Sequence, residues 1–345
     1  MDNWLTSSNG KNEDLVISSR VRLARNLAKV PFPHKLNEEK SKKVIELVEN
    51  AFYKDDNIKN QFTTNYLWNK NENERKMFLE KHLISNNLID SSNKSAFILN
   101  KDETISIMIN EEDHIRIQCI TSGLNLEEVY DVSDKIDNIL EEDLEYAFDE
   151  RFGYLTSCPT NLGTGLRASV MLHLPAISFN NQINGLLNTL SQVGMTIRGL
   201  HGEGSRALGN IYQISNQVTL GRSEEEIMTN LKVLVNQVIN EEKSCRANII
   251  KNSRYELENE MYRCLGILRY AVLLGLNEAL NFLSYVRLGV EMGMIKDISK
   301  STLNSLLVEI QPANIQQNSN TVLTNREINF KRAKIVREKL KNVTA

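Results

Sequence analysis

One stretch of the chain contains several arginines but almost no acid. Between Glu150 and Glu224 the only carboxylate is Glu203, although the 345-residue chain has 44 acidic residues. Two glycine-rich segments, NLGTGLR (161–167) and RGLHGEGS (198–205), lie in this stretch. Glycine lets backbone N–H groups approach phosphate oxygens, and arginine pairs with phosphate through a planar fork of fixed charge. The stretch therefore predicts a phosphate-binding surface, against the alternative of two ordinary surface turns, and its arginines are Arg151, Arg167, Arg198, Arg206 and Arg222.

Common nucleotide-binding fingerprints do not account for this stretch. A P-loop requires G-x-x-x-x-G-K-[ST], a string that the chain lacks. GTGLRA (163–168) fits the form G-x-G-x-x-A, but the acid expected about 20 residues later to hold a ribose is missing. The H-R-D and D-F-G strings of eukaryotic-type protein kinases are also absent. If the chain binds a nucleotide, it does so through a different motif.

Further arginines lie in strand-like segments, VISSRVRLARN (16–26) and TISIMINEEDHIRIQCI (104–120). In the second, apolar residues alternate on either side of NEEDH, which predicts two antiparallel strands joined by a tight turn. Such a hairpin places Glu111, Glu112 and Arg116 near one end of a sheet. Arg20 and Arg22 are two residues apart on an extended chain, so their side chains share a face and can clamp one phosphate chain together.

Four of these segments carry a resemblance to a known family. SSRVRLARN, NEEDHIR, CPTNLGTGLRAS (158–169) and RGLHGEGS resemble the guanidino phosphotransferases, or phosphagen kinases, and the similarity covers about residues 15–245. Within that family the chain most resembles the bacterial protein-arginine kinases. Phosphagen kinases have a small helical domain before the SSRVR-like strand, whereas here that strand begins at Ser18 and a helical segment follows at the C-terminus. The resemblance implies that the lid enclosing a small metabolite is missing.

The resemblance implies a site for ATP with Mg²⁺, the metal being held mainly by the nucleotide phosphates and by no protein ligand. Five arginines would surround the phosphates, which suits a transferring phosphoryl group whose charge spreads over its oxygens. His82 would lie at the base or ribose, although a lone histidine in a helical pattern is also typical of a surface residue. The backbones of 18–22, 167–171 and 198–203 would line the same pocket. The residues expected to contact the nucleotide are therefore Ser18, Ser19, Arg20, Val21, Arg22, His82, Arg116, Arg167, Ala168, Ser169, Val170, Met171, Arg198, Gly199, Leu200, His201, Gly202 and Glu203.

The acceptor requires different groups. A guanidinium has a pKa above 12, so it must be aligned and lose a proton as its nitrogen attacks phosphorus. Glu112 and Glu203 match the family's paired substrate glutamates, and the sequence leaves open which of them is the base. Glu111 and Asp113 are interpreted as turn residues. Cys158 matches the family's cysteine beside the guanidino group, where cations favour the thiolate, against the alternative of a small buried apolar residue.

The remaining sequence is helical by pattern. Ser223 and Glu226 form a capping-box signature at the start of an apolar stripe over 227–238, which predicts a helix that closes the catalytic domain. Helical spacing continues beyond it, and 311–325 is interpreted as a loop. We therefore predict an α+β fold: a catalytic domain (1–245) with a central antiparallel β-sheet flanked by helices, followed by an all-helical domain (246–345).

One string in the helical domain leaves two interpretations open. Related protein-arginine kinases have an R-D-x-x-R-A string there that recognises phosphoarginine. The aligned string here is INFKRA (328–333), in which only Arg332 and Ala333 match. Regulation by phosphoarginine is one interpretation, and a solvated helix face over the basic run 331–341 is the other.

Composition excludes several classes. No 18-residue apolar run is present, the N-terminus is polar, and the four cysteines match neither a disulfide framework nor paired zinc ligands, so we expect a cytoplasmic protein with thiols. A net charge of −3 gives no bulk attraction to nucleic acid.

Three functions remain: a protein-arginine kinase, which the resemblance favours, a kinase for a small guanidino metabolite, or a catalytically silent nucleotide-binding adaptor. The resemblance also implies a homodimer formed through the helical domain, an activator protein, delivery of marked proteins to a Clp-type protease, and a role in the stress response.

Overall fold

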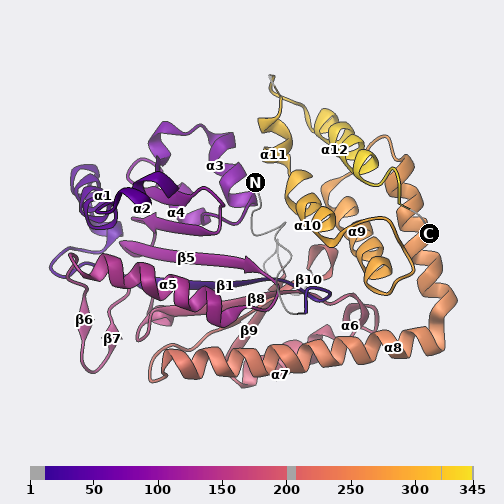
Figure 1. Cartoon of the computed structure of the whole chain (residues 1–345), viewed down its shortest axis with the longest axis horizontal. Coiled ribbons are helices and arrows are strands. Elements are labelled where there is room, and N and C mark those ends of the chain that lie inside the picture. Colours follow the sequence, from indigo (N-terminus) through magenta and orange to yellow (C-terminus); the bar gives the residue numbers. More distant parts are fainter. Residues whose placement is uncertain (1–11, 200–206, 320, 344–345) are drawn as a thin grey trace.

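The computed structural model describes residues 12–199, 207–319 and 321–343. Its centre is an eight-stranded sheet in which every neighbouring pair of strands is antiparallel (Figure 1). The predicted α+β fold with a central antiparallel sheet is therefore confirmed. In spatial order the strands are β2 (Phe62–Tyr66), β3 (Ala96–Asn100), β4 (Ile105–Ile109), β5 (Ile115–Ser122), β1 (Val16–Arg25), β8 (Leu166–His173), β10 (Ile211–Asn216) and β9 (Met195–Gly199).

The central strands are those that the sequence predicted most clearly. β4 and β5 form the expected hairpin around NEEDH, with Ile109 opposite Ile115. β1, which carries SSRVR, lies between β5 and β8 although these strands are far apart in the sequence. The segments that resemble the phosphagen kinases therefore meet in adjacent strands. A separate two-stranded ribbon, β6 (Phe148–Asp149) and β7 (Gly153–Tyr154), precedes the Cys158 loop.

Strand register gathers the arginines on one side of the sheet. Directly paired residues share a face, and successive residues of a strand alternate between faces. Arg22 lies opposite Gln118 of β5 and also opposite Arg167 of β8. The same pairing, followed across all the central strands, puts five guanidinium side chains on one side, which we call the arginine face: Arg20, Arg22, Arg116, Arg167 and Arg198.

The opposite face of the sheet holds the main apolar core. Alternate residues of the same strands, such as Val21, Ile117 and Val170, are fully buried there. Three amphipathic helices supply the other half of this core: α1 (Glu38–Phe52), α5 (Leu126–Glu141) and the first part of α8 (Glu224–Tyr270). In Figure 1, α5 and α8 run along the sheet. Because this side is closed by helices, only the arginine face is left for polar chemistry.

Two groups of helices border the arginine face. At one end α3 (Glu72–Glu80) and α4 (Asn86–Asp90) pack Phe78 and Leu88 on Phe97 and Met108 of the sheet. At the other end Val308 of α10 (Lys300–Glu309) packs on Met171 of β8. The other helices are α2 (Asp56–Gln61), α6 (Pro175–Phe179), α7 (Ile183–Gln192), α9 (Leu276–Glu291), α11 (Pro312–Gln317) and α12 (Asn325–Lys339).

The long helix α8 crosses the predicted domain boundary. It begins with the expected capping box, in which Ser223 and Glu226 bond each other's backbone N–H. It then continues to Tyr270, with one non-helical residue at Ser253. Residue 245 therefore lies inside a helix rather than in a linker, and the division into domains 1–245 and 246–345 stays a prediction.

The prediction that 311–325 is a loop was wrong for its first half, where α11 forms. Pro312 occupies the first turn of this helix, a position at which proline is well tolerated. The free N–H groups of Ala313 and Asn314 are accepted by the carboxylate of Glu80, at 2.9 and 3.0 Å. Because Glu80 lies on α3, more than 200 residues earlier, local sequence could not reveal this cap.

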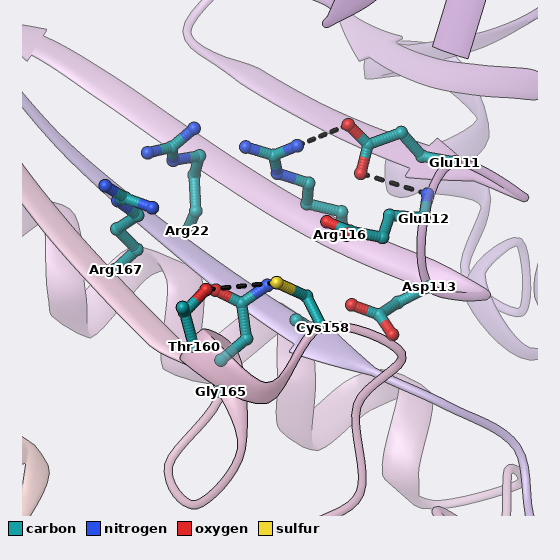
Figure 2. Close-up of a pocket in the computed structure, with 11 residues that line it drawn as sticks. Arg22, Glu111, Glu112, Asp113, Arg116, Cys158, Thr160, Gly165 and Arg167 are labelled. Carbon is teal, nitrogen blue, oxygen red and sulfur yellow. Dashed lines mark hydrogen bonds and ion pairs between the residues drawn. The ribbon is translucent and has the colours of Figure 1, made fainter. Parts of the chain in front are cut away.

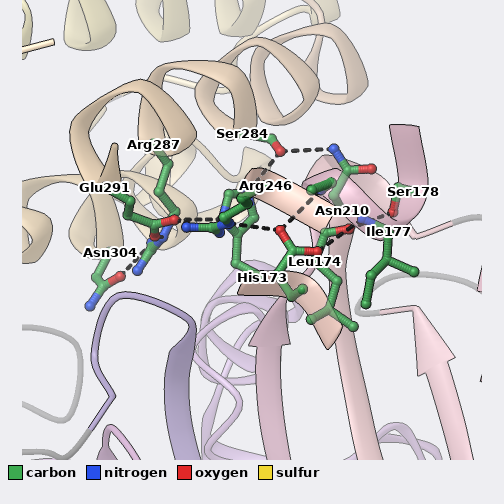
Figure 3. A network of polar contacts seen from close by, with 12 residues as sticks. His173, Leu174, Ile177, Ser178, Asn210, Arg246, Ser284, Arg287, Glu291 and Asn304 are labelled. Carbon is green, nitrogen blue, oxygen red and sulfur yellow. Dashed lines mark hydrogen bonds and ion pairs between the residues drawn. The ribbon is translucent and has the colours of Figure 1, made fainter. Parts of the chain in front are cut away.

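A buried network of charges attaches the C-terminal helices to the sheet (Figure 3). Glu242 of α8 accepts from the backbone N–H groups of Ala176 and Ile177, at the start of α6. Arg246 pairs with Glu242 at 2.8 Å and with Glu291 of α9 at 2.8 Å. Arg287 also pairs with Glu291, at 2.9 Å. These charges balance one another, as buried charges must.

None of the described helices has the length and apolar character needed to cross a lipid bilayer.

Candidate active site

A small pocket of about 120 Å³ opens on the arginine face (Figure 2). It collects residues from β1, from the NEEDH turn and β5, and from the loop before β8. Because these strands are adjacent, segments that are remote in sequence meet at one point. We call it the Cys158 pocket, and its lining consists of Arg22, Ala24, Glu111, Glu112, Asp113, Arg116, Cys158, Thr160, Asn161, Gly165 and Arg167.

The arginines of this face lie close to one another and have few hydrogen-bond partners. Burial, and then repulsion from Arg116 and Arg167, lowers the pKa of Arg20 to about 10. Burial and the neighbouring guanidinium groups also lower the pKa of Arg22. The Nε atoms of Arg22 and Arg167 are buried without a hydrogen-bond partner. Buried donors normally have partners, so these two are available to hydrogen-bond a ligand that carries oxygen acceptors.

One acid is already paired with the cluster. Glu111 bonds Arg116 through one carboxylate oxygen, which also accepts from Ser85, while its other oxygen accepts from the backbone N–H of Glu112 at 3.2 Å. Burial opposes the charge of Glu111, but Arg116 and these hydrogen bonds outweigh it and lower its pKa. Among the described residues, the arginine face has no other ion pair. Glu111 therefore positions Arg116 and Glu112 relative to each other.

Glu112 is free of such pairing and faces Cys158. Burial first, and then repulsion from Asp113 and Glu111, raises its pKa, while Arg116 and a hydrogen bond with Cys158 act in the opposite direction. A carboxylate with a raised pKa accepts a proton more readily than an ordinary surface glutamate. The group that the sequence predicted for the acceptor side is thus suited to act as a base.

Asp113 fixes the Cys158 loop against the NEEDH turn. Its Oδ1 accepts from the backbone N–H of Ser157 at 2.6 Å and from Nδ2 of Asn26 at 2.7 Å. Asn26 in turn accepts from the backbone N–H of His114 at 2.9 Å. Glu112 and Cys158, the neighbours of Asp113 and Ser157, are thereby held close together.

Glycine allows the Cys158 loop to lie on β1. Gly165 has φ +65°, and a Cβ there would approach the carbonyl oxygen of Ala24 to 2.5 Å and Nη1 of Arg25 to 2.7 Å. Cys158 itself is half-buried, and its Sγ lies 3.1 Å from Oγ1 of Thr160. The alternative that Cys158 is a small core residue is therefore wrong.

Arg25 anchors the same loop from the core side of the sheet. Its guanidinium pairs with Asp137 at 2.6 Å, donates to the carbonyl oxygens of Ala24 and Thr164 at 3.0 Å, and lies 3.6 Å from the ring centroid of Tyr154. The even positions Arg20 and Arg22 of β1 thus lie on the arginine face, whereas the odd position Arg25 lies on the opposite face and anchors the Cys158 loop.

The other predicted nucleotide contacts fall into three groups. Arg20, Ser18, Ser169, Met171 and Arg198 lie on the arginine face outside the pocket lining. The side chains of Ser19, Val21, Ala168 and Val170 lie on the opposite face, and because the sequence predicted a contact through the backbone of these residues, that contact stays a prediction. Gly199 ends β9, and Leu200, His201, Gly202 and Glu203 lie outside the described residues.

His82 lies in the turn after α3 rather than within a helix. Its backbone has φ +61°, uncommon for a residue other than glycine, and its carbonyl oxygen accepts from Nε2 of Gln118 at 2.7 Å. Gln118 is the residue directly opposite Arg22. The turn that contains His82 therefore borders the arginine face.

The sequence interpretation missed Glu111 and Asp113 as positioning residues and Arg25 as an anchor. The signal for Arg25 was present, because its odd position on β1 predicts the opposite face from Arg20 and Arg22. The tasks of Glu111 and Asp113 had no local signal, since their partners Ser85 and Asn26 lie 26 and 87 residues away.

Arg332 of INFKRA is buried and its hydrogen bonds are made internally. It donates to the carbonyl oxygens of Ile310 and Leu274 at 2.8 and 2.9 Å and to Oδ1 of Asn329 at 2.5 Å. The interpretation of a fully solvated helix face therefore fails at Arg332. A cavity of about 530 Å³ adjoins it, lined in part by Ile328 and Glu278.

Two family matches divide the chain. Residues 43–245 match the family described as "ATP:guanido phosphotransferase, C-terminal catalytic domain", and residues 254–345 match "Protein-arginine kinase McsB C-terminal domain". The first match begins after β1, yet the structure puts β1 in the middle of the same sheet.

Curated relatives agree over the whole length. The chain is 68% identical to a protein-arginine kinase of Clostridium kluyveri over 100% of both chains, and 54% identical to a protein-arginine kinase of Clostridium acetobutylicum over 99% of this chain and 100% of that one.

Solved structures show the same fold. A lombricine kinase matches with TM-score 0.61 and 25% identity over 72% of each chain. The duplicated taurocyamine kinase of Schistosoma mansoni, with bound transition-state analogue components, matches with TM-score 0.62 and 26% identity over 76% of this chain and 39% of that one. The chain therefore belongs to the ATP:guanido phosphotransferase family and, within it, to the protein-arginine kinases.

Proposed function

We propose that this protein transfers the γ-phosphoryl group of ATP to arginine side chains of proteins. The observation that carries the proposal is the arginine face, where two buried Nε donors lack partners beside a carboxylate of raised pKa. Fixed positive charge stabilises the phosphate chain and the transferring group, while Glu112 and Cys158 receive the acceptor.

In this mechanism the attacking atom is a terminal nitrogen of the acceptor guanidinium. An N–P bond forms to the γ-phosphorus as the bond between that phosphorus and the bridging oxygen of ADP breaks. Glu112, with Glu203 as the second predicted carboxylate, aligns the guanidinium and takes up the proton that it loses. Arg22, Arg116 and Arg167 hold the phosphate oxygens in line.

Mg²⁺ would enter this site bound to the nucleotide phosphates. Among the described residues, no group of three or more His, Cys, Asp or Glu side chains could hold a metal ion. When bound to the phosphates, Mg²⁺ offsets the charge on the β- and γ-oxygens. His82 is proposed to contact the base or ribose because its turn borders the arginine face.

The test is an incubation with γ-labelled ATP, Mg²⁺ and either an arginine-rich unfolded protein or free arginine. The account predicts acid-labile label on the protein, as expected for an N–P bond. Label on free arginine alone would support a metabolite kinase, and nucleotide binding without transfer would support a silent adaptor.

A homodimer through the C-terminal helices is part of the proposal. In that region Tyr255, Tyr270 and Val272 are 82%, 76% and 61% exposed, so these side chains are available to a second subunit. Light scattering at micromolar concentration tests this, and a monomer throughout would contradict it.

A cytoplasmic location, a role in the stress response, an activator protein and delivery of marked proteins to a Clp-type protease are further proposals from the family resemblance. Co-purification with an activator or protease subunit from the cytoplasmic fraction of stressed cells is the corresponding test.

A further inference from the structure

The short helix α11 packs against α3, so that the C-terminal helices contact the first part of the chain. The contact is polar and specific. Glu80, the last residue of α3, accepts from the backbone N–H groups of Ala313 and Asn314 and from Nδ2 of Asn314, at 2.9, 3.0 and 2.8 Å. Asn73 adds a donation to the carbonyl oxygen of Ala313 at 3.2 Å.

The residues after Glu80 lead directly to the site. Lys81 pairs with Glu103 at 2.6 Å, and the carbonyl oxygen of His82 accepts from Gln118 at 2.7 Å. Ser85 then donates to Glu111, the acid that pairs with Arg116. The segment 81–85 is therefore held by the sheet on one side.

On its other side, segment 81–85 depends on the orientation of α3. Apolar packing holds α3 on the sheet through Phe78, and Leu83 and Ile84 pack in the same cluster. The three hydrogen bonds of Glu80 are the contacts that tie this end to α11. They are made to a charged acceptor, and hydrogen bonds of that kind are stronger than neutral ones.

We propose that Glu80 is a positioning residue for nucleotide binding. By holding the end of α3 on α11, it sets the position of His82 and of the Ser85–Glu111–Arg116 chain relative to Arg22. The inference rests on the proposed function, in which the arginine face holds ATP. It assigns the C-terminal helices a direct part in forming the nucleotide site.

The test is Glu80→Ala in the full-length protein, with ATP affinity measured by titration and steady-state kinetics measured with a protein substrate. We expect the Kd and KM for ATP to rise by about 3- to 30-fold, the usual range for a residue that acts through its neighbours, with kcat changed by less than about twofold. Glu80→Gln, which keeps one acceptor oxygen, should restore part of the affinity.

Glu72→Ala is the matched control. Glu72 lies on the same helix and, among the residues that the structure describes, forms its ion pair with Lys76 at 2.5 Å on the surface, so ATP affinity should not change. If Glu80→Ala does not fold, Asn314→Ala removes one of the three hydrogen bonds and should raise the Kd for ATP in the same direction by a smaller factor.

Unchanged ATP affinity in Glu80→Ala, with or without a lower melting temperature, would overturn the proposal and leave Glu80 as a structural cap. Failure of the proposed function is distinguishable, because the wild-type protein would then transfer no phosphate to arginine whatever its ATP affinity.

Discussion

At the scale of single residues, the three neighbouring acids of the site differ in their hydrogen-bond and ion-pair partners. Three consecutive acids share one turn, yet Glu111 is paired with Arg116, Asp113 accepts hydrogen bonds from the Cys158 loop, and Glu112 remains available. Burial raises the pKa of Glu112, and repulsion from the other two acids raises it further.

The first prediction concerns the acid limb of the pH–rate profile. Because the pKa of Glu112 is raised, kcat/KM should fall as the pH drops through a value above that of an ordinary glutamate, about 4.3. Asp113→Asn keeps Oδ1 as an acceptor but removes one repelling charge, so the limb should move to lower pH. A limb that stays in place would show that Glu112 is not the titrating base.

At the scale of elements, β1 is the organising strand. Arg20 and Arg22 face the ligand side, and Arg25 ties the Cys158 loop from the other side of the sheet. The loop then passes so close to β1 that only glycine fits at position 165.

The second prediction tests that close approach. Gly165→Ala forces a Cβ to within 2.5 Å of the carbonyl oxygen of Ala24 at a positive φ, so the loop must move. We expect a large loss of kcat and a loss of stability of about 1–3 kcal/mol. Gly185→Ala is the control: it lies in α7 with no atom within 4 Å of the new Cβ, so activity should be unchanged and stability should increase slightly. Thermal melts and steady-state assays of both variants test this prediction. Equal melting temperatures and equal kcat values for the two variants would contradict this account of the loop.

Sequence periodicity predicted the elements that have local signals. The NEEDH hairpin, the SSRVR strand and the capped start of α8 all formed as expected, because alternation and capping are encoded within a few residues. The start of α11 and the tasks of Glu111 and Asp113 depend on partners far along the chain, such as Glu80 and Asn26, so no local pattern contained them.

At the scale of the whole molecule, the C-terminal helices are joined to the sheet by buried charge. Burial opposes ionisation of Glu291, but His173 and then Arg246 and Arg287 outweigh this and lower its pKa to about 2. Burial lowers the pKa of His173 despite the nearby Glu291, and Arg246 and Arg287 supply the fixed positive charge of the network.

The third prediction follows from this network. Glu291→Gln leaves two buried guanidinium groups short of a counter-charge and should destabilise the protein by about 3–5 kcal/mol near pH 7. Because the folded-state pKa of Glu291 lies below its unfolded value, its contribution is present above about pH 4.3 and is lost as the pH falls towards 2. The difference in urea midpoint between wild type and variant should therefore shrink on acidification. Glu39 forms an exposed pair with Lys43, so Glu39→Gln is the control and should leave the urea midpoint unchanged. If the urea midpoint of Glu291→Gln equals that of Glu39→Gln, the proposed role of the network is wrong.

The central claim is that the arginine face holds ATP while Glu112 acts on the acceptor. The most direct measurement is single-turnover transfer of label from ATP to protein arginine, together with ATP titration, for Glu112→Gln and Arg167→Ala. The account predicts that Glu112→Gln binds ATP normally and transfers at least about 100-fold more slowly, whereas Arg167→Ala loses ATP affinity and transfer together. Near-normal transfer by Glu112→Gln, or a loss of ATP binding as large as that of Arg167→Ala, would contradict it.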